Sequence, residues 1–253
     1  MKRILYIIGI AAACSLTACS ERDLQTKIVE KSISTALTDG SRDSLHLEIT
    51  LEWPVNGLPP VAMQNIQREL NAAIFGKEFS ETSLKQAIEL YVGKKEQEYR
   101  QNISDLKRIL PLDNSQEGVY SWNEMTEGRF LEPYNNMQSY ILYKYGYTGG
   151  AHGIDSELGL TFSLSTGKQI TESDLFVREY KQSLTQLLTE QLPKAVNKDI
   201  YDMLFIKAIE PNGNFYIDNE GITYIYGRYE IGPYVSGIVR VTLPWNKLIN
   251  ILK

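Results

Sequence analysis

Apolar residues follow a strand-like alternation in some stretches of the chain and a helix-like spacing in others. The order of these stretches limits the fold more than any other feature. Apolar residues alternate with polar ones over 45–51, which predicts a half-buried strand. Helical spacing of apolar residues then predicts one helix over 62–74 and a longer one over about 81–108. Beyond Pro111 the period returns to that of strands, with one further helical stretch over about 180–192.

Candidate strands therefore outnumber the helices that could connect them. They fall at 120–122, 140–145, 158–164, 215–217, 222–226 and 238–243, and a short helix over 246–252 ends the chain. Parallel neighbours each need a crossover connection, so this excess of strands favours antiparallel pairing. We predict an α+β fold with antiparallel sheets, helices packed on one face, and two intertwined subdomains.

The N-terminus has the pattern of a lipoprotein signal peptide. Lys2 and Arg3 precede an apolar run over 4–13, which is too short to cross a bilayer. The tetrad Leu16-Thr17-Ala18-Cys19 resembles the bacterial lipobox, in which the chain is cut before a cysteine that carries acyl chains. We predict lipidation at Cys19 and a lipid-anchored protein of the cell envelope, periplasmic or at the outer-membrane surface. An ordinary signal peptide followed by a chance cysteine is the alternative.

Cysteine usage and charge narrow the chemistry of the mature chain. There are two cysteines, and cleavage before Cys19 would discard Cys14. The mature domain would then have no free thiol, no internal disulfide and no thiolate metal ligand. The formal net charge is −5, and loss of Lys2 and Arg3 brings it to −7 (−5 minus 2). This acidity argues against nucleic acid as a partner and suits a cationic protein.

Composition and period divide the chain into four segments. Residues 1–18 are the predicted signal peptide, and residues 19–44, polar without a clear period, are the predicted tether. Residues 45–135 are predicted to form an N-terminal α+β domain, and 136–253 a C-terminal α+β domain. The membrane is expected to be contacted through the lipid anchor.

Catalytic motifs are missing from the sequence. There is no Gly-x-Ser-x-Gly elbow, no His-Glu-x-x-His pair and no phosphate-binding loop. We therefore predict no catalytic residue, no metal site and no cofactor. Carboxylates are plentiful, and their spacing in sequence leaves a glycosidase neither supported nor excluded.

The segment Tyr147-Thr148-Gly149-Gly150-Ala151-His152-Gly153 is the most unusual in the chain. Its glycines allow backbone conformations that other residues avoid, which predicts a tight turn holding His152. The candidate binding residues here are Tyr147, Gly149, Gly150 and His152. The alternative is a structural turn whose histidine bonds to backbone carbonyls, because a lone histidine lacks the partners that catalysis needs.

A second tyrosine-rich segment covers 224–237. Alternation places Tyr224 and Tyr226 on one face of a strand, which favours a role in the core. Tyr229, Glu230 and Tyr234 lie nearer a turn and are the second set of candidate binding residues, since tyrosine combines a large contact area with a polar tip.

These residues carry a family resemblance. The Tyr147–Gly153 segment and, later, Tyr229-Glu230-Ile231-Gly232-Pro233-Tyr234 resemble a family of bacterial extracytoplasmic domains of unknown function. The resemblance covers roughly 140–253, and 45–120 is similar to the companion domain that usually precedes it. Members include the outer region of a lysozyme-sensing anti-sigma factor and the accessory N-terminal region of a peptidoglycan deacetylase. The deacetylase's catalytic domain and the anti-sigma factor's spanning helix are both missing here, so neither specific role carries over.

Three functions remain open. The first is a non-catalytic binding lipoprotein that recognises an envelope glycan such as peptidoglycan, or a cationic protein such as lysozyme, as the resemblance implies. The second is an envelope glycan hydrolase or deacetylase-like enzyme, which would need His152 and an acid such as Glu230 or Asp155 to converge in one cleft. The third is a structural or assembly lipoprotein whose sheet edge pairs with another chain.

Overall fold

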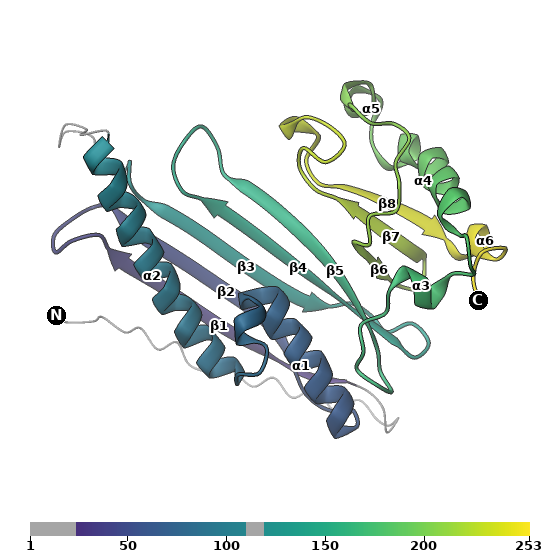
Figure 1. Ribbon diagram of the computed structural model, residues 1–253, viewed down its shortest axis with the longest axis horizontal. Coiled ribbons are helices and arrows are strands. Elements are labelled where there is room, and N and C mark those ends of the chain that lie inside the picture. The colour runs from purple at the N-terminus through teal and green to yellow at the C-terminus, as the bar shows by residue number, and fades with distance from the viewer. Residues whose placement is uncertain (1–23, 110–118) are drawn as a thin grey trace.

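A computed structural model describes residues 24–109 and 119–253, so the predicted signal peptide and Cys19 lie outside the described residues. The described part is α+β, as predicted, and contains a five-stranded and a three-stranded sheet (Figure 1). No helix within these two ranges is long and apolar enough to cross a membrane.

The larger sheet is mostly antiparallel. Its strands lie in the order β1-β2-β3-β4-β5, and only the β2–β3 pair is parallel. They are β1 (Gln25–Ala36), β2 (Ser44–Asn56), β3 (Trp122–Phe130), β4 (Met137–Tyr147) and β5 (Ile154–Ser163). The parallel pair needs a crossover, and α1 (Pro60–Phe75), the 3₁₀ turn η1 (Lys77–Phe79) and α2 (Leu84–Ile109) lie along it. Both helices therefore cover the same face of the sheet (Figure 1).

The core of this part forms between that face and the helices. Alternate residues of β2 point into it, and Leu45, Leu47, Ile49 and Leu51 are almost fully buried. They pack against the apolar stripes of the two helices, which confirms both predicted helices and the strand before them. Gly93 does not interrupt the long helix α2.

The smaller sheet belongs to the C-terminal part of the chain. Its strands are β6 (Phe215–Ile217), β7 (Gly221–Tyr226) and β8 (Val239–Pro244), all antiparallel. Around it lie α3 (Glu172–Leu175), α4 (Lys181–Ala195), α5 (Lys198–Met203), the 3₁₀ turn η2 (Tyr234–Ser236) and α6 (Trp245–Leu248). Leu184, Leu188 and Leu192 of α4 share a core with Tyr224 and Tyr226, whose predicted burial is confirmed.

The two sheets meet on the face of β4 and β5 that is turned away from α1 and α2. There the Ser139 hydroxyl accepts from the Ile217 amide at 2.9 Å and donates to the Ile217 carbonyl at 2.7 Å. Asn214 receives the Gly159 amide at 2.9 Å and donates to the Glu157 carbonyl at 2.9 Å. β6 thus lies across the outer face of β5, which positions the loops of the smaller sheet beside the β4–β5 turn.

Two predicted segment boundaries are wrong. The tether over 19–44 contains β1, which pairs with β2 along its whole length. As an edge strand it is exposed on one face and only half-buried on the other, where Lys31 separates Val29 from Ile33, so its pattern lacks a continuous apolar side. The domain boundary at 135 falls between β3 and β4, which are hydrogen-bonded neighbours, so the division between the sheets comes instead after β5. The helical stretch predicted over about 180–192 corresponds to α4, and the short helix α3 precedes it.

Candidate functional site

The β4–β5 turn has the tight geometry that its glycines predict. Gly149 and Gly150 adopt positive φ angles of 100° and 94°, which are strained for other residues. The Tyr147 hydroxyl donates to the Gly150 carbonyl at 3.0 Å and closes the turn. Two of the candidate residues, Gly149 and Gly150, therefore shape the loop, and Tyr147 braces it.

The loop between β7 and β8 is braced by its own glutamate. Glu230 accepts from the Gly227 amide at 2.7 Å and from the Asn212 side chain at 2.7 Å. Tyr229 has a positive φ of 64° and is 52% exposed. Candidate residue Glu230 thus fixes the loop that presents Tyr229 and Tyr234.

The two loops form one site. The ring of His152 stacks on the ring of Tyr234, with centroids 3.9 Å apart and planes 28° from parallel. The Tyr234 hydroxyl donates to the Gly153 carbonyl at 2.8 Å, and His152 Nδ1 lies 3.1 Å from the same oxygen. Tyr229 lies beside them, with its centroid 6.0 Å from that of Tyr234. We call His152, Tyr234 and Tyr229 the aromatic junction.

An ion pair that the sequence analysis missed holds the junction in place. Arg228 donates through Nε and Nη2 to the Asp155 carboxylate, and through Nη1 to the Tyr234 carbonyl at 2.6 Å. Its guanidinium lies 4.1 Å from the centroid of the Tyr234 ring. The hydrogen bond from Arg228 holds the pKa of Asp155 below its ordinary value. Asp155 was considered only as an acid for His152, and nothing in the sequence pairs it with Arg228, 73 positions away.

This arrangement does not bring the acids of a hydrolase to His152. Asp155 is engaged by Arg228 and also accepts from the Tyr143 hydroxyl at 3.4 Å, while Glu230 braces its own loop. Within the described residues, the contacts of His152 are the Tyr234 ring and the Gly153 carbonyl. The described residues also contain no group of three or more His, Cys, Asp or Glu side chains that could hold a metal ion.

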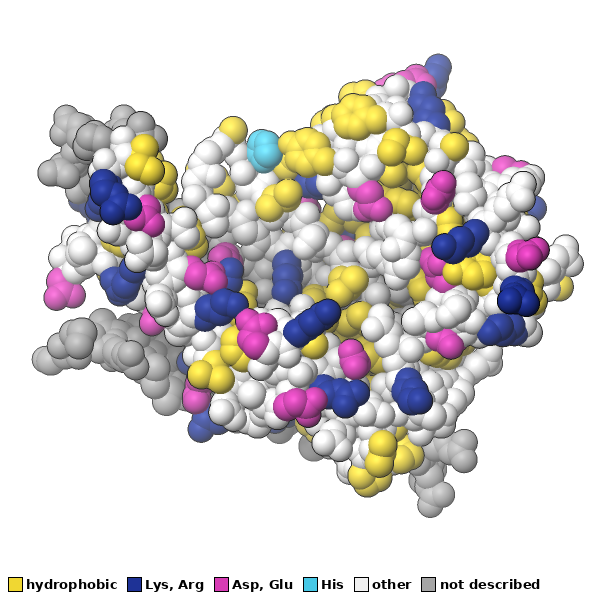
Figure 2. Space-filling view, in the orientation of Figure 1, with side chains coloured by type: hydrophobic (Ala, Val, Ile, Leu, Met, Phe, Trp, Pro, Cys, Tyr) yellow, Lys and Arg dark blue, Asp and Glu magenta, His cyan; other side chains and the backbone are white. Residues whose placement is uncertain are grey.

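Exposed apolar side chains lie next to the aromatic junction. The Phe205 and Ile206 amides both donate to the Ile231 carbonyl, at 2.9 and 3.2 Å, which ties the segment after α5 to the β7–β8 loop. Hydrophobic side chains gather over α5 and η2 in the space-filling view (Figure 2). We call this group the apolar ridge; its members and exposed fractions are Phe205 68%, Val235 62%, Ile206 47% and Met203 43%. The sequence analysis missed it, although the apolar run over 203–206 outside any helical period was a visible signal.

A cleft of about 640 Å³ lies between the C-terminal end of α1, the middle of α2, strands β3–β5 and the loop at Arg228. The Lys144 ammonium reaches from β4 to the last turn of α1, where it donates to the Ala73 and Ile74 carbonyls at 3.2 and 2.7 Å. Burial, and secondarily the nearby charge of Lys95, lowers the pKa of Lys144. Lys95 in turn pairs with Glu124 at 3.0 Å. Asp155 and Arg228, which hold the aromatic junction in place, are among the residues that line this cleft.

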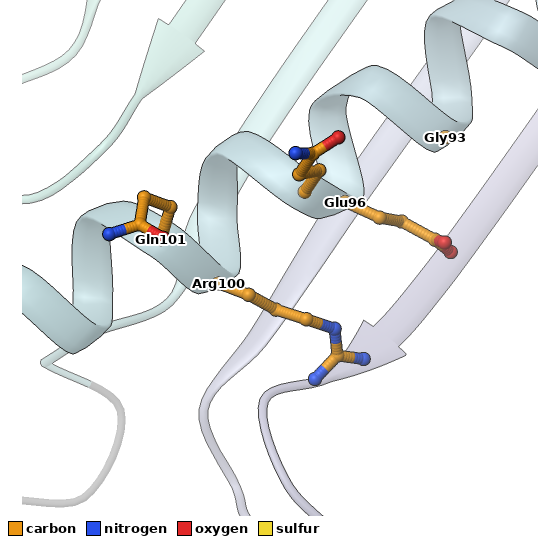
Figure 3. A pocket seen from close by; sticks show the side chains of 5 residues that line it. Gly93, Glu96, Arg100 and Gln101 are labelled. Atoms are coloured by element: carbon orange, nitrogen blue, oxygen red, sulfur yellow. The ribbon is translucent and has the colours of Figure 1, made fainter.

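A smaller hollow of about 410 Å³ lies on the outer side of α2 (Figure 3). Its charged side chains are occupied in joining α2 to β1. Glu96 accepts from the Thr35 hydroxyl at 2.7 Å, and Arg100 donates to the carbonyls of Leu37 and Ala36. This hollow is therefore part of the helix–strand contact.

Comparison with known proteins finds a similarity in the C-terminal part. Residues 173–246 match the model of DUF3298, described as a protein of unknown function. The match lies within the predicted C-terminal domain and begins after the Tyr147–Gly153 segment. No curated protein matches the chain.

The similarity to solved structures extends beyond residues 173–246 and covers most of the chain. A crystal structure of a DUF3298 family member from Bacteroides fragilis has a TM-score of 0.82 at 26% identity, covering 92% of this chain and 95% of that chain. A DUF3298 family protein from Pseudomonas aeruginosa has a TM-score of 0.65 at 16% identity, covering 92% and 96%. At that identity the second likeness shows the fold alone.

Proposed function

We propose that this chain, whose residues 173–246 match the DUF3298 model of unknown function, is a non-catalytic binding lipoprotein of the cell envelope. It holds its partner at the end of the molecule formed by the aromatic junction and the apolar ridge. The observation that carries the proposal is the stacking of His152 on Tyr234 at 3.9 Å, which makes two separate tyrosine-rich loops into one surface.

The chemistry of this end favours a protein partner. Phe205 and Val235 are each more than 60% exposed, and exposed apolar groups beside tyrosines are typical of protein interfaces. The net charge of −5 favours association with a cationic protein. Lysozyme is such a protein, and the family resemblance of the C-terminal part points to it as the first partner to test.

The position of the predicted anchor agrees with this use. Cys19 precedes β1 in sequence, and β1 begins at the lower edge of the molecule in Figure 1, near the start of α1. The β4–β5 turn, η2 and α5 lie at the upper edge. A chain anchored at Cys19 would therefore present the aromatic junction and the apolar ridge away from the membrane.

Substitutions in the apolar ridge test the partner. We expect Phe205→Ser with Val235→Ser to weaken capture by immobilised lysozyme by at least about tenfold, because both exposed side chains would be lost from a central contact. Biolayer interferometry at low and physiological salt would measure the affinity. Ile249→Ser is the matched control, since Ile249 is 70% exposed in the short segment after α6. No capture by the unmodified protein at low salt would remove lysozyme as the partner.

Lipidation is tested separately. Replacing Cys19 with alanine should abolish incorporation of a palmitate analogue during growth and release the protein from the membrane fraction, because Cys19 supplies the thiol that is acylated. Cys14→Ala is the matched control and should leave labelling unchanged. Labelling that persists in Cys19→Ala would show that the anchor is elsewhere.

Two other functions have less support. A hydrolase or deacetylase-like enzyme would need a free acid beside His152, whereas Asp155 and Glu230 are both engaged elsewhere. An assembly role through strand pairing has one observation in its favour, the exposed edge of β1. That strand carries Lys27, Glu30 and Lys31, and charged residues on an edge strand discourage pairing. An envelope glycan as the ligand is favoured by a different feature, the cleft.

A further inference from the structure

We propose that the cleft between α1, α2 and strands β3–β5 binds an uncharged saccharide rich in hydroxyl groups. The inference deepens the proposed envelope role by naming a ligand class for a second site. It does not depend on a protein binding at the apolar ridge, and the two sites can be tested separately.

The floor of the cleft departs from the pattern of the sheet around it. Elsewhere the face turned toward the helices is apolar, as the buried side chains of Leu51, Leu142 and Leu160 illustrate. In the cleft the same face carries a polar row across β3, β4 and β5, Thr126–Lys144–Ser156. The row beside it is Glu124–Gly146–Ile154, with a carboxylate and a glycine next to one isoleucine. Polar groups at positions where a sheet normally buries its apolar side indicate a surface kept open to solvent or a ligand.

Gly146 is the residue that most clearly indicates a cleft kept open for a ligand. Glycine weakens a strand interior, and it is found there where a bulge, a bend or the approach of a ligand requires it. Gly146 has no positive φ angle, and its register with Glu124 and Ile154 is regular. A Cβ atom added to it would meet no atom within 4 Å. Neither a special backbone conformation nor close packing explains why position 146 is a glycine. A ligand lying over Gly146 would explain it.

The charges of the cleft are already balanced by the protein. Among the residues that the structure describes, Lys94 pairs with Glu78 at 2.7 Å, Lys95 with Glu124 at 3.0 Å, and Arg228 with Asp155. Lys144 donates to the carbonyls at the end of α1, where the helix dipole is negative. A charged ligand would have to displace one of these partners. An uncharged ligand would not, and it would find many donors and acceptors around it.

Size and apolar surface agree with a sugar. A cleft of about 640 Å³ lies within the usual range for small-ligand sites. Ile154 is 55% exposed at one side, and the half-buried Tyr91 lines the other. Burial, the charge of Glu124 and a hydrogen bond to its carboxylate raise the pKa of Tyr91, and the Tyr91 oxygen is then left to accept from a sugar hydroxyl. Ser156, exposed on the floor, offers a second hydroxyl.

Filling the cleft tests the inference. We expect the full-length protein in detergent to bind tetra-N-acetylchitotetraose or cellotetraose in isothermal titration calorimetry, and Gly146→Phe to weaken that binding by at least about tenfold. Ser156→Trp should do the same from the neighbouring row. Ser32→Phe, on an exposed position of β1, is the matched control and should bind as the unmodified protein does. Thermal unfolding of each variant verifies that it is folded.

The outcomes separate this inference from the function proposed above. Loss of sugar binding in Gly146→Phe with unchanged lysozyme capture supports a distinct saccharide site. Three results would overturn it: no binding of either neutral tetrasaccharide, unchanged affinity in both folded cleft variants, or tighter binding of tetragalacturonate than of the neutral sugars. Failure of lysozyme capture alone would leave it standing.

Discussion

Replacing Arg240 with methionine is expected to lower the free energy of unfolding by about 3 kcal/mol, the lower end of the cost of breaking a buried ion pair. Arg240 on β8 donates through Nε at 2.7 Å, and through Nη2, to the Glu157 carboxylate on β5. The Glu157 side chain is only 5% exposed, whereas that of Arg240 is 45% exposed. Methionine keeps most of the apolar stem but leaves a buried carboxylate without its partner, at the contact between the two sheets.

Glu157→Gln supplies the comparison for this prediction. It removes the buried charge, and the half-exposed guanidinium can then be solvated, so we expect a cost of only about 1 kcal/mol. The double variant Arg240→Met/Glu157→Gln should be more stable than Arg240→Met alone. Urea unfolding followed by circular dichroism measures all three. Equal costs for the two single variants would contradict the view that the burial of Glu157 dominates.

Gly159→Ala is expected to destabilise the protein by about 3 kcal/mol or more, because overpacking against backbone cannot be relieved by a change of rotamer. A Cβ atom at Gly159 would lie 2.4 Å from the Phe215 carbonyl oxygen and 3.0 Å from the Tyr216 nitrogen. Both belong to β6, so the methyl group would push the smaller sheet away from β5. The hydrogen bonds between Asn214 and the β5 backbone would then lengthen or break.

Gly146→Ala is the matched control for this second prediction. Gly146 lies on the neighbouring strand β4, and a Cβ atom there would meet nothing within 4 Å. The alanine should therefore be neutral, or stabilise the fold by up to about 1 kcal/mol by restricting the unfolded chain. Thermal and urea unfolding would compare the pair. A similar cost at both positions would mean that strand propensity, rather than the contact with β6, decides the effect at Gly159.

Much of the fold could be predicted from periodicity because its helices and central strands each bury one side. The stripes of α1 and α2 and the alternation over 45–51 follow directly from that requirement. β1 could not be found in the same way, because this edge strand is exposed on one face and only half-buried on the other, and polar residues lie on both faces. The boundary at 135 failed for a related reason: a local pattern does not show that β3 and β4 pair across it.

The candidate site was predicted in part. The glycines and tyrosines of Tyr147–Gly153 indicate a tight turn, since only glycine takes the required φ angles without strain, and the turn is present. Tyr229 and Tyr234 were placed near the surface by the end of the strand pattern, and Tyr229 is exposed. The role of Glu230 as a brace and the presence of Arg228 beneath Tyr234 depend on contacts that spacing does not encode.

What the sequence determined by itself is therefore local: the class of each main element, the tight turn before β5, the acidity of the chain, and a mature domain without a free thiol if Cys19 is acylated. The tertiary structure decided what those elements do together. Tyr234 reaches Gly153 across 81 positions, and Arg228 reaches Asp155 across 73, because β6 lies over the outer face of β5. Such contacts arise from how two sheets pack, and packing selects partners by shape and burial rather than by distance along the chain.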